Sequence, residues 1–224
     1  MVKQKSEISP MPGPRGRRAV QAEQTRAEIL SAARQLFAAS GYAATGVKDI
    51  AAHAGVSVQT VYDSVGSKAD LVRRLNDLID VEAGVGEIAM TIPSTTDPVA
   101  LARLPAMITR RIVERCGDIL RACSDGARAE PDLSHVVDEG GRRHRAGARG
   151  VAERLAALGA LDAGLSIDQA AVTIAMLADH RVALVMLDDH EYTLDEVEEW
   201  IATTTALAVL RRKTGAPTRS APAT

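Results

Sequence analysis

The chain has 224 residues, of which 46% are hydrophobic and 25% charged, so it can fold around one large core or two small ones, and wholesale disorder is excluded. Aromatic residues make up only 2%, which argues against a protein that binds single-stranded nucleic acid by stacking bases on rings. The formal net charge of -2 hides an asymmetry, because residues 1–75 carry 11 Lys and Arg against 6 Asp and Glu, and this basic third favours an anionic partner, either nucleic acid or a membrane surface.

The first 21 residues show no periodic pattern. They are rich in proline, glycine and basic side chains, and this composition predicts a disordered basic arm over residues 1–21. The pattern changes at Thr25, which has capping-box spacing with Glu28, and apolar residues then recur at helical intervals. We therefore expect a first helix that begins near Thr25 and is ended by Gly41.

Three further helices are predicted in the next forty residues. Thr45 is expected to cap a short helix that stops at Gly55, and Ser57 is expected to cap the next one. Ser67 and Asp70 have the spacing of another capping box, which opens a longer helix.

The remainder of the chain also has helical periodicity, after a loop around residues 92–98. Pro105 is expected to end or kink the first helix of this part, and capping boxes begin the last two helices at Ser166 and Thr193. No segment alternates as a strand does, so the predicted fold class is all-α, and residues 214–224 are expected to be a disordered tail. The helices of this part are predicted over roughly 98–105, 107–116, 118–128, 133–158, 167–187 and 194–211.

Three features favour a cytoplasmic protein. The N-terminus has charge and proline where a signal peptide needs an apolar stretch. The two cysteines, Cys116 and Cys123, are too few for a disulfide framework and are expected to be buried free thiols. The most apolar window, residues 170–187, contains the charged residues Asp179 and Arg181, which predicts a buried helix and no membrane span.

The helices between Thr25 and Ser64 have the spacing of a helix-turn-helix. Gly55 suits the left-handed turn between the second and third helices, and the small Ala51 suits the point where these helices cross. The outward face of the third helix is expected to enter a major groove, where glutamine can pair with adenine and valine or threonine can contact thymine methyl groups. The residues of this helix expected to contact DNA are Val58, Gln59, Thr60, Tyr62 and Ser64.

Phosphate contacts have separate candidates. Lys68 lies in the first turn of a helix, where its ammonium group and the free backbone N–H groups could converge on one phosphate. Arginines of the N-terminal arm are candidates for an adjacent minor groove, although an inert arm fits the sequence equally well. The residues expected to contact the DNA backbone or the minor groove are Thr25, Thr45, Lys48, Lys68, Arg15, Arg17 and Arg18.

The order of these features over residues 25–71 resembles the TetR family of bacterial transcriptional regulators. One departure lies at Ser64-Val65, where the family usually has an aromatic pair such as His-Phe. The loss of apolar area and of a phosphate contact there is expected to affect DNA affinity and not the fold. The positions that carry the resemblance are Phe37, Gly41-Tyr42, Thr45, Asp49-Ile50-Ala51, Ala54-Gly55-Val56-Ser57, Thr60-Val61-Tyr62, Ser67-Lys68 and Leu71.

The resemblance implies an all-α homodimer. Each subunit would have an N-terminal three-helix helix-turn-helix domain, residues 22–70, followed by a larger helical effector-binding and dimerisation domain, residues 71–213. Members of the family mostly repress transcription from palindromic operators in double-stranded DNA, and they release the DNA when a small-molecule effector binds. The last two helices would pair with their copies in a four-helix bundle, through apolar residues at positions 171, 174, 178, 182, 185, 197, 201, 207, 208 and 210.

The body of the chain is low in aromatic residues and rich in Ala, Val, Leu and Met, which favours an apolar effector. Arg110, Arg111 or His180 would meet a carboxylate if the effector carried one. His180 also fits a polar pair at the dimer interface. The residues expected to contact the effector are Met107, Arg111, Leu120, Cys123, Met176 and His180.

Two alternatives to a ligand-responsive repressor are open at this point. An enzyme is disfavoured, because the sequence has no H-E-x-x-H or G-x-S-x-G motif and no dense cluster of metal ligands, and Gly66-Ser67-Lys68 lacks the upstream glycine of a phosphate loop. We therefore expect no catalytic residues, no cofactor and no metal. The second alternative is an architectural or partner-recruiting DNA-binding protein without an effector. A closed body would favour it, whereas an apolar pocket would favour the repressor.

Overall fold

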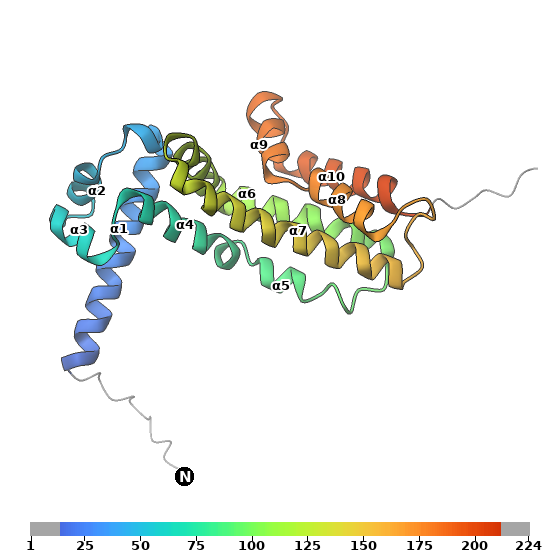
Figure 1. Ribbon diagram of the computed structural model, residues 1–224, viewed down its shortest axis with the longest axis horizontal. Coiled ribbons are helices and arrows are strands. Elements are labelled where there is room, and N and C mark those ends of the chain that lie inside the picture. Colours follow the sequence, from blue (N-terminus) through green and yellow to red (C-terminus); the bar gives the residue numbers. More distant parts are fainter. Residues whose placement is uncertain (1–13, 212–224) are drawn as a thin grey trace, which may run out of the picture.

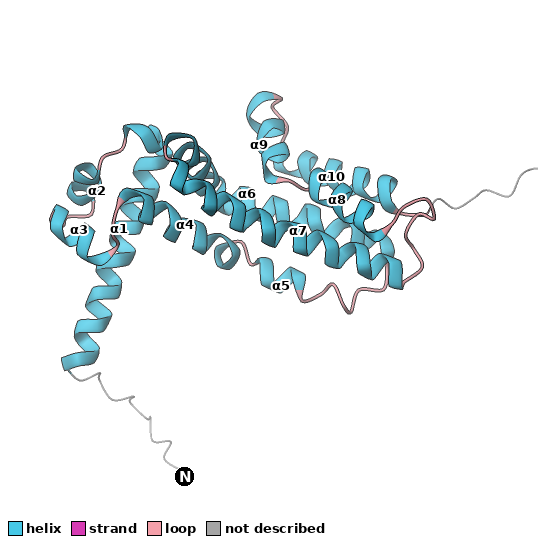
Figure 2. Cartoon of the chain, viewed as in Figure 1, coloured by secondary structure: helices cyan, strands magenta, loops and turns pink. Residues whose placement is uncertain are grey.

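The computed structural model describes residues 14–211, which form an all-α molecule (Figures 1 and 2). The predicted fold class is confirmed. A 3-10 turn, η1 (Pro131–Leu133), precedes α7. The α-helices are α1 (Pro14–Ala44), α2 (Val47–His53), α3 (Val58–Ser64), α4 (Lys68–Glu82), α5 (Val85–Ala89), α6 (Pro98–Ala129), α7 (Ser134–Ala157), α8 (Ile167–Leu177), α9 (His180–Asp189) and α10 (Leu194–Val209).

Helices α1, α2 and α3 form the helix-turn-helix at one end of the molecule, and α4 leads from them into a larger helical body (Figure 1). The turn between α2 and α3 contains Gly55, whose φ of 67° lies in the left-handed region that glycine enters without steric cost. Ile50, Ala51 and Val61 are buried between the helices. The crossing and the turn therefore have the form that the sequence predicted.

Helix α1 is longer than predicted. It begins at Pro14, so the prediction of a disordered arm is wrong for residues 14–21; residues 1–13 and the expected tail at 214–224 lie outside the described part of the chain. Proline is preorganised for the first helical position, and the arginine, alanine and glutamine residues that follow favour helix. These residues are exposed from position 17 to 24, so no buried apolar stripe revealed the helix. Thr25 consequently lies inside α1 and does not cap it.

In the body, α6 and α7 run along the long axis of the molecule (Figure 1). Helix α6 packs against α1, α4 and α10, and α7 packs against α8. One hydrophobic cluster contains buried residues of α1, α2, α3, α4, α6, α9 and α10. A second contains buried residues of α5, α6, α7, α8 and α10. Helices α4 and α6 pack against each other and both contact α1. They therefore connect the helix-turn-helix to the body.

The long helix α6 corrects two predictions. Pro105 lies inside it and does not end it, although proline cannot donate the hydrogen bond that Leu101 would accept. The backbone leaves helical angles at Cys116, with φ of -132° and ψ of 16°. The predicted boundary between residues 116 and 118 is therefore present as a kink within one helix.

The predicted helix over residues 167–187 is two helices, α8 and α9. The carboxylate of Asp179 accepts the backbone N–H of Arg181 at 2.8 Å and caps a new helix, which explains the break. By length and composition alone, the stretch Ile167–Asp189 is apolar enough to cross a membrane, with a mean hydropathy of 1.6. Only 33% of its most apolar 18 residues are buried, so the prediction of a buried helix is also wrong. Helices of 11 and 10 residues are each too short to cross a bilayer, which needs about 20.

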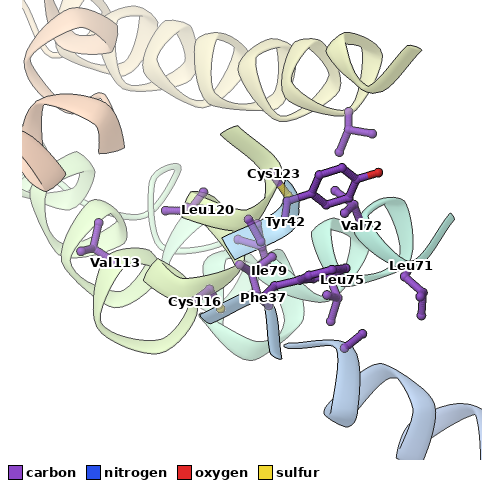
Figure 3. Packing of buried hydrophobic residues seen from close by; sticks show 14 of the residues in the cluster. Phe37, Tyr42, Leu71, Val72, Leu75, Ile79, Val113, Cys116, Leu120 and Cys123 are labelled. Carbon is purple, nitrogen blue, oxygen red and sulfur yellow. The ribbon is translucent and has the colours of Figure 1, made fainter. Parts of the chain in front are cut away.

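The core between the two ends of the molecule is built around two rings of α1. Phe37 and Tyr42 have centroids 5.4 Å apart and pack with Leu75 of α4 and Cys123 of α6 (Figure 3). Val65, which stands at the departure from the family pattern, is only 4% exposed. Its smaller side chain thus still takes part in the core, in agreement with the expectation that the departure leaves the fold intact.

Candidate functional site

The exposed face of α3 begins at its N-terminal cap. Ser57 Oγ accepts the backbone N–H of Thr60 at 3.0 Å, which starts the helix and leaves Gln59 and Tyr62 exposed. Tyr62 is 50% exposed. Gln59 Nε2 donates to Asp63 Oδ1 at 2.8 Å on the same exposed surface, so a base edge can replace this partner at little cost.

The other residues of α3 that were expected to contact DNA are less accessible. Val58 packs against the hydrophobic core. The half-buried Thr60 has its hydroxyl 2.8 Å from that of Ser57, and the half-buried Ser64 accepts a hydrogen bond from Arg26 Nε to its carbonyl at 3.2 Å. Arg26, which the sequence did not single out, thereby holds α3 against α1. The accessible face of α3 is therefore narrower than predicted.

Lys68 and Thr45 have internal partners. Lys68 Nζ donates to the carbonyls of Tyr42 at 3.0 Å and of Thr45 at 3.1 Å, and it lies 4.0 Å from the centroid of the Tyr42 ring. Thr45 is 4% exposed, its hydroxyl donates to the Gly41 carbonyl at 2.8 Å, and Gly46 is the N-cap of α2 in its place. The prediction that Thr45 caps α2 is therefore wrong. Both side chains satisfy backbone carbonyls near the end of α1, and their contact with DNA stays a prediction.

The remaining candidates for DNA contact lie on α1 and α2. Lys48 is exposed in the first turn of α2, and Thr25 is half-buried in α1. Arg17 and Arg18 are exposed near the start of α1, in the same helical segment as Arg15. These cations are thus presented from a helix, and their contact with DNA stays a prediction.

A charged cluster joins the N-terminal domain to the body. Arg34 of α1 donates to Asp118 of α6 at 2.5 and 2.9 Å and to Glu82 of α4 at 2.7 Å. It also donates to the carbonyl of Arg115 at 2.6 Å, next to the kink at Cys116. The hydrogen bond to Asp118 is the main reason that the pKa of Arg34 is raised, so the cluster stays charged. No sequence signal links residues so far apart.

A cavity of 380 Å³ lies in the body, bounded by α4, α5, α6, α7 and α8. This size falls in the range of small-molecule sites, about 300–1,000 Å³. Its walls are mainly aliphatic, and no Phe, Tyr or Trp of the described chain lines it. The apolar lining residues include Ile79, Val85, Ile92, Ile108, Ile112, Leu120, Val151 and Ile174.

The cavity includes half of the predicted effector contacts. Those that line it are Leu120, Cys123 and His180. Met107 instead packs beside the second hydrophobic cluster, Arg111 pairs with Glu87 at 3.7 Å, and Met176 is 65% exposed. Residue type alone could not distinguish these positions, because the direction of each side chain depends on the packing of its helix.

The sequence analysis did not identify several polar groups of the cavity. Asn76 of α4 lines it and is only 8% exposed. Arg143 Nε lies 2.7 Å from Asp80 Oδ2, so these two charges neutralise each other at the wall. His144 Nε2 donates to the Ala175 carbonyl at 2.8 Å. The polar lining is therefore mostly engaged within the protein.

One histidine and both cysteines near the cavity favour their neutral forms. Burial lowers the pKa of His180, against an opposing effect of Asp179. Burial raises the pKa of Cys123 to about 12 and that of Cys116 to about 11. Both cysteines are free and buried, as predicted, and their thiols stay protonated at neutral pH. Among the described residues, no group of His, Cys, Asp or Glu is arranged to hold a metal ion.

The positions predicted for a four-helix dimer bundle divide into two groups. Many of them face the interior of the same chain, since Ala171, Ile174, Ala178, Val197 and Ile201 are buried. For these positions the predicted role is corrected. The predicted positions Val185 and Leu207 are exposed instead, as are Val172 and Met176, which the sequence analysis did not assign to the bundle.

Comparison with known proteins agrees with this geometry. Residues 29–75 match the family model described as bacterial regulatory proteins of the tetR family. The resemblance seen in the sequence is thereby confirmed for the helix-turn-helix. No curated protein matches the sequence.

Solved structures share the fold over most of the chain. The regulator SmeT bound to triclosan is 19% identical with a TM-score of 0.66, covering 90% of this chain and 99% of its own; SmeT is described as the repressor of the Stenotrophomonas maltophilia efflux pump SmeDEF. The TetR-family regulator PfmR of Thermus thermophilus is 22% identical with a TM-score of 0.61, covering 84% and 96%. NalD, a secondary repressor of the Pseudomonas aeruginosa efflux pump MexAB-OprM, is 19% identical with a TM-score of 0.63, covering 85% and 98%.

Proposed function

We propose that this protein, a transcriptional regulator of the TetR-family fold, is a cytoplasmic homodimeric repressor that binds a palindromic operator in double-stranded DNA and releases it when a small molecule occupies the cavity. The observation that carries the proposal is the pairing of two sites through shared helices. Gln59 and Tyr62 are exposed on the second helix of a helix-turn-helix, and the 380 Å³ cavity is bounded by α4 and α6, which also contact α1. No catalytic role is proposed for any residue.

Helix α4 provides the mechanical connection. It starts at the Ser67–Asp70 capping box beside α3, and further along it presents Asn76, Ile79 and Asp80 to the cavity. In a dimer, two recognition helices must enter major grooves about 34–36 Å apart, so a small change in the angle of α4 alters their spacing. An effector acts only through its different affinity for the DNA-binding and the released shape.

The exposed apolar side chains support a dimer through the C-terminal helices. Val172, Met176, Val185 and Leu207 are 63%, 65%, 47% and 66% exposed. Burial of such side chains contributes about 1.5–3 kcal/mol each, and a second copy of the chain would cover them symmetrically. The cavity also weighs against the purely architectural alternative, for which a closed body was expected.

Selection of bound sequences from a random duplex pool, at two salt concentrations, tests the proposal. We expect a two-fold symmetric sequence whose binding survives the higher salt. Gln59→Ala should relax the preference at one base position in each half-site, whereas Lys48→Ala should weaken binding to all sequences equally. Binding that is blind to sequence and lost at higher salt would contradict the proposed function.

A further inference from the structure

Asn76 is one of the few buried polar side chains among the described residues. It is only 8% exposed, it lines the cavity, and its amide makes no hydrogen bond with any described residue. Buried amides are normally hydrogen-bonded, because an unsatisfied donor or acceptor costs about 1–3 kcal/mol. Thr109, another polar residue of the wall, differs in this respect, since its hydroxyl donates to the Ala178 carbonyl at 2.7 Å. The amide of Asn76 thus borders the cavity, where a bound molecule can supply its hydrogen-bond partner.

The surface around Asn76 selects for aliphatic chemistry. Ile79 lies one turn further along α4, and Ile108, Ile112 and Leu120 approach from α6. Branched aliphatic side chains contact a hydrocarbon chain or an alicyclic ring well, and the described lining contains no Phe, Tyr or Trp ring for stacking.

The charges around the cavity leave no spare cation or anion among the described residues. Arg143 is held between Asp80 at 2.7 Å and Glu139 at 3.6 Å. Asp179 is paired with Arg181 at 2.6 Å. A charged ligand would find these groups already paired and would lose its own hydration on entering the mainly aliphatic cavity, which costs free energy.

We infer that the cavity binds an uncharged, mainly aliphatic molecule with one polar head, such as a hydroxyl or an amide, that exchanges hydrogen bonds with the side-chain amide of Asn76. This inference deepens the proposed function and rests on the cavity being the effector site. It places the head against α4, the helix that begins beside the DNA-binding helix α3, so the same contact that selects the ligand also biases the position of α4.

Calorimetric titration of the full chain with probes of one chain length tests the inference. We would use 1-decanol and decanamide as uncharged probes, and decanoate and decylammonium as charged ones. The uncharged probes should bind at least about tenfold more tightly than either charged probe, because no unpaired charge awaits the latter. Tighter binding of decanoate or of decylammonium would overturn the inference.

Two variants locate the polar head. Asn76→Leu keeps the volume and removes the amide, so the affinity for 1-decanol should fall about five- to tenfold while the melting temperature stays equal or rises. Ser124→Ala is the matched control, since it removes a hydroxyl that lines the cavity from α6, a different helix, and should leave the affinity unchanged. An unchanged affinity in Asn76→Leu, or an equal loss in both variants, would contradict the assigned head position.

Operator binding by the same protein separates this inference from the proposed function. Sequence-specific DNA binding without binding of any uncharged probe would overturn the inference and leave the proposed function as a DNA-binding regulator intact. Probe binding that depends on Asn76, with no sequence-specific DNA binding, would support the ligand class and overturn the repressor.

Discussion

Lys68 provides a direct test of what the tertiary structure adds to the sequence. The sequence favours a phosphate contact, whereas the structure has the ammonium bound to the carbonyls of Tyr42 and Thr45 and above the Tyr42 ring. Lys68→Met keeps the apolar stem and removes the charge, so it isolates these interactions.

The size of the effect follows from the contacts that are lost. Hydrogen bonds to a charged group contribute about 1.5–3 kcal/mol and a partly exposed cation–π contact about 0.5–1 kcal/mol, but they overlap here on one half-buried ammonium, so we expect a loss of about 2 kcal/mol. For a chain of this length, 1 kcal/mol corresponds to about 2–4 °C, so the melting temperature should fall by about 4–8 °C.

The assay pairs thermal unfolding with the salt dependence of DNA binding. In Lys68→Met, the slope of log K against log salt should stay unchanged, because no phosphate contact is lost. The matched control is Lys48→Met, an exposed lysine of the same domain, which should keep its melting temperature and lose about one unit of slope. If Lys68→Met melts like the unmodified protein and its slope of log K against log salt falls by about one, the internal role of Lys68 is refuted and its contact with a DNA phosphate is supported.

Three further predictions concern stability and reactivity. Burial alone would raise the pKa of Asp179, but hydrogen bonds from Arg181 lower it to about 2. The stability that this carboxylate contributes, about 2 kcal/mol, is complete above the unfolded pKa near 4 and is lost as the pH falls toward 2. Asp179→Asn should therefore flatten the acid dependence of urea unfolding between these pH values. Gly66→Ala should cost about 1–3 kcal/mol in urea titrations, because the residue has a φ of 105° and an added Cβ would lie 2.5 Å from a carboxylate oxygen, whereas Gly55→Ala meets no atom within 4 Å and should cost less. Burial raises the pKa of Cys123 to about 12, so alkylation at mildly alkaline pH, followed by mass spectrometry, should be slow in the folded protein and fast in urea.

Each of these predictions has a contradicting result. An acid-unfolding curve of Asp179→Asn parallel to that of the unmodified protein would show that this carboxylate has no role in acid stability. Equal losses in the two glycine variants would mean that the contact at Gly66 relaxes freely. Rapid alkylation of Cys123 without denaturant would show that the region around the cavity opens readily.

Much of the helix-turn-helix could be predicted from the sequence, because it depends on residues that are close in the chain. The capping box of Ser67 with Asp70 and the N-cap at Ser57 are both present. Gly55 adopts the left-handed turn that its position between two helices required. These features involve hydrogen bonds and backbone angles within about four residues, where local chemistry decides the conformation.

Predictions failed where local signals compete with packing or are absent. The helical start of α1 at Pro14 carries no buried stripe, and Pro105 did not end α6, whose body is held by helices on several sides. For the predicted effector contacts, residue type alone selected both Leu120, which lines the cavity, and Met176, which is exposed and does not line it. A preference of a few tenths of a kcal/mol per residue is easily outweighed by tertiary contacts.

The sequence by itself determined the all-α class, the helix-turn-helix and the resemblance to TetR-family regulators, because helical periodicity, caps and turn residues are written in short segments. Only the tertiary structure decided that Lys68 turns inward, that Arg34 joins Glu82 and Asp118 across 48 and 84 residues of sequence, and that Asn76 faces a cavity. Those outcomes depend on which helices pack together. Such packing is a sum of many small contacts between distant residues, and no local pattern records it.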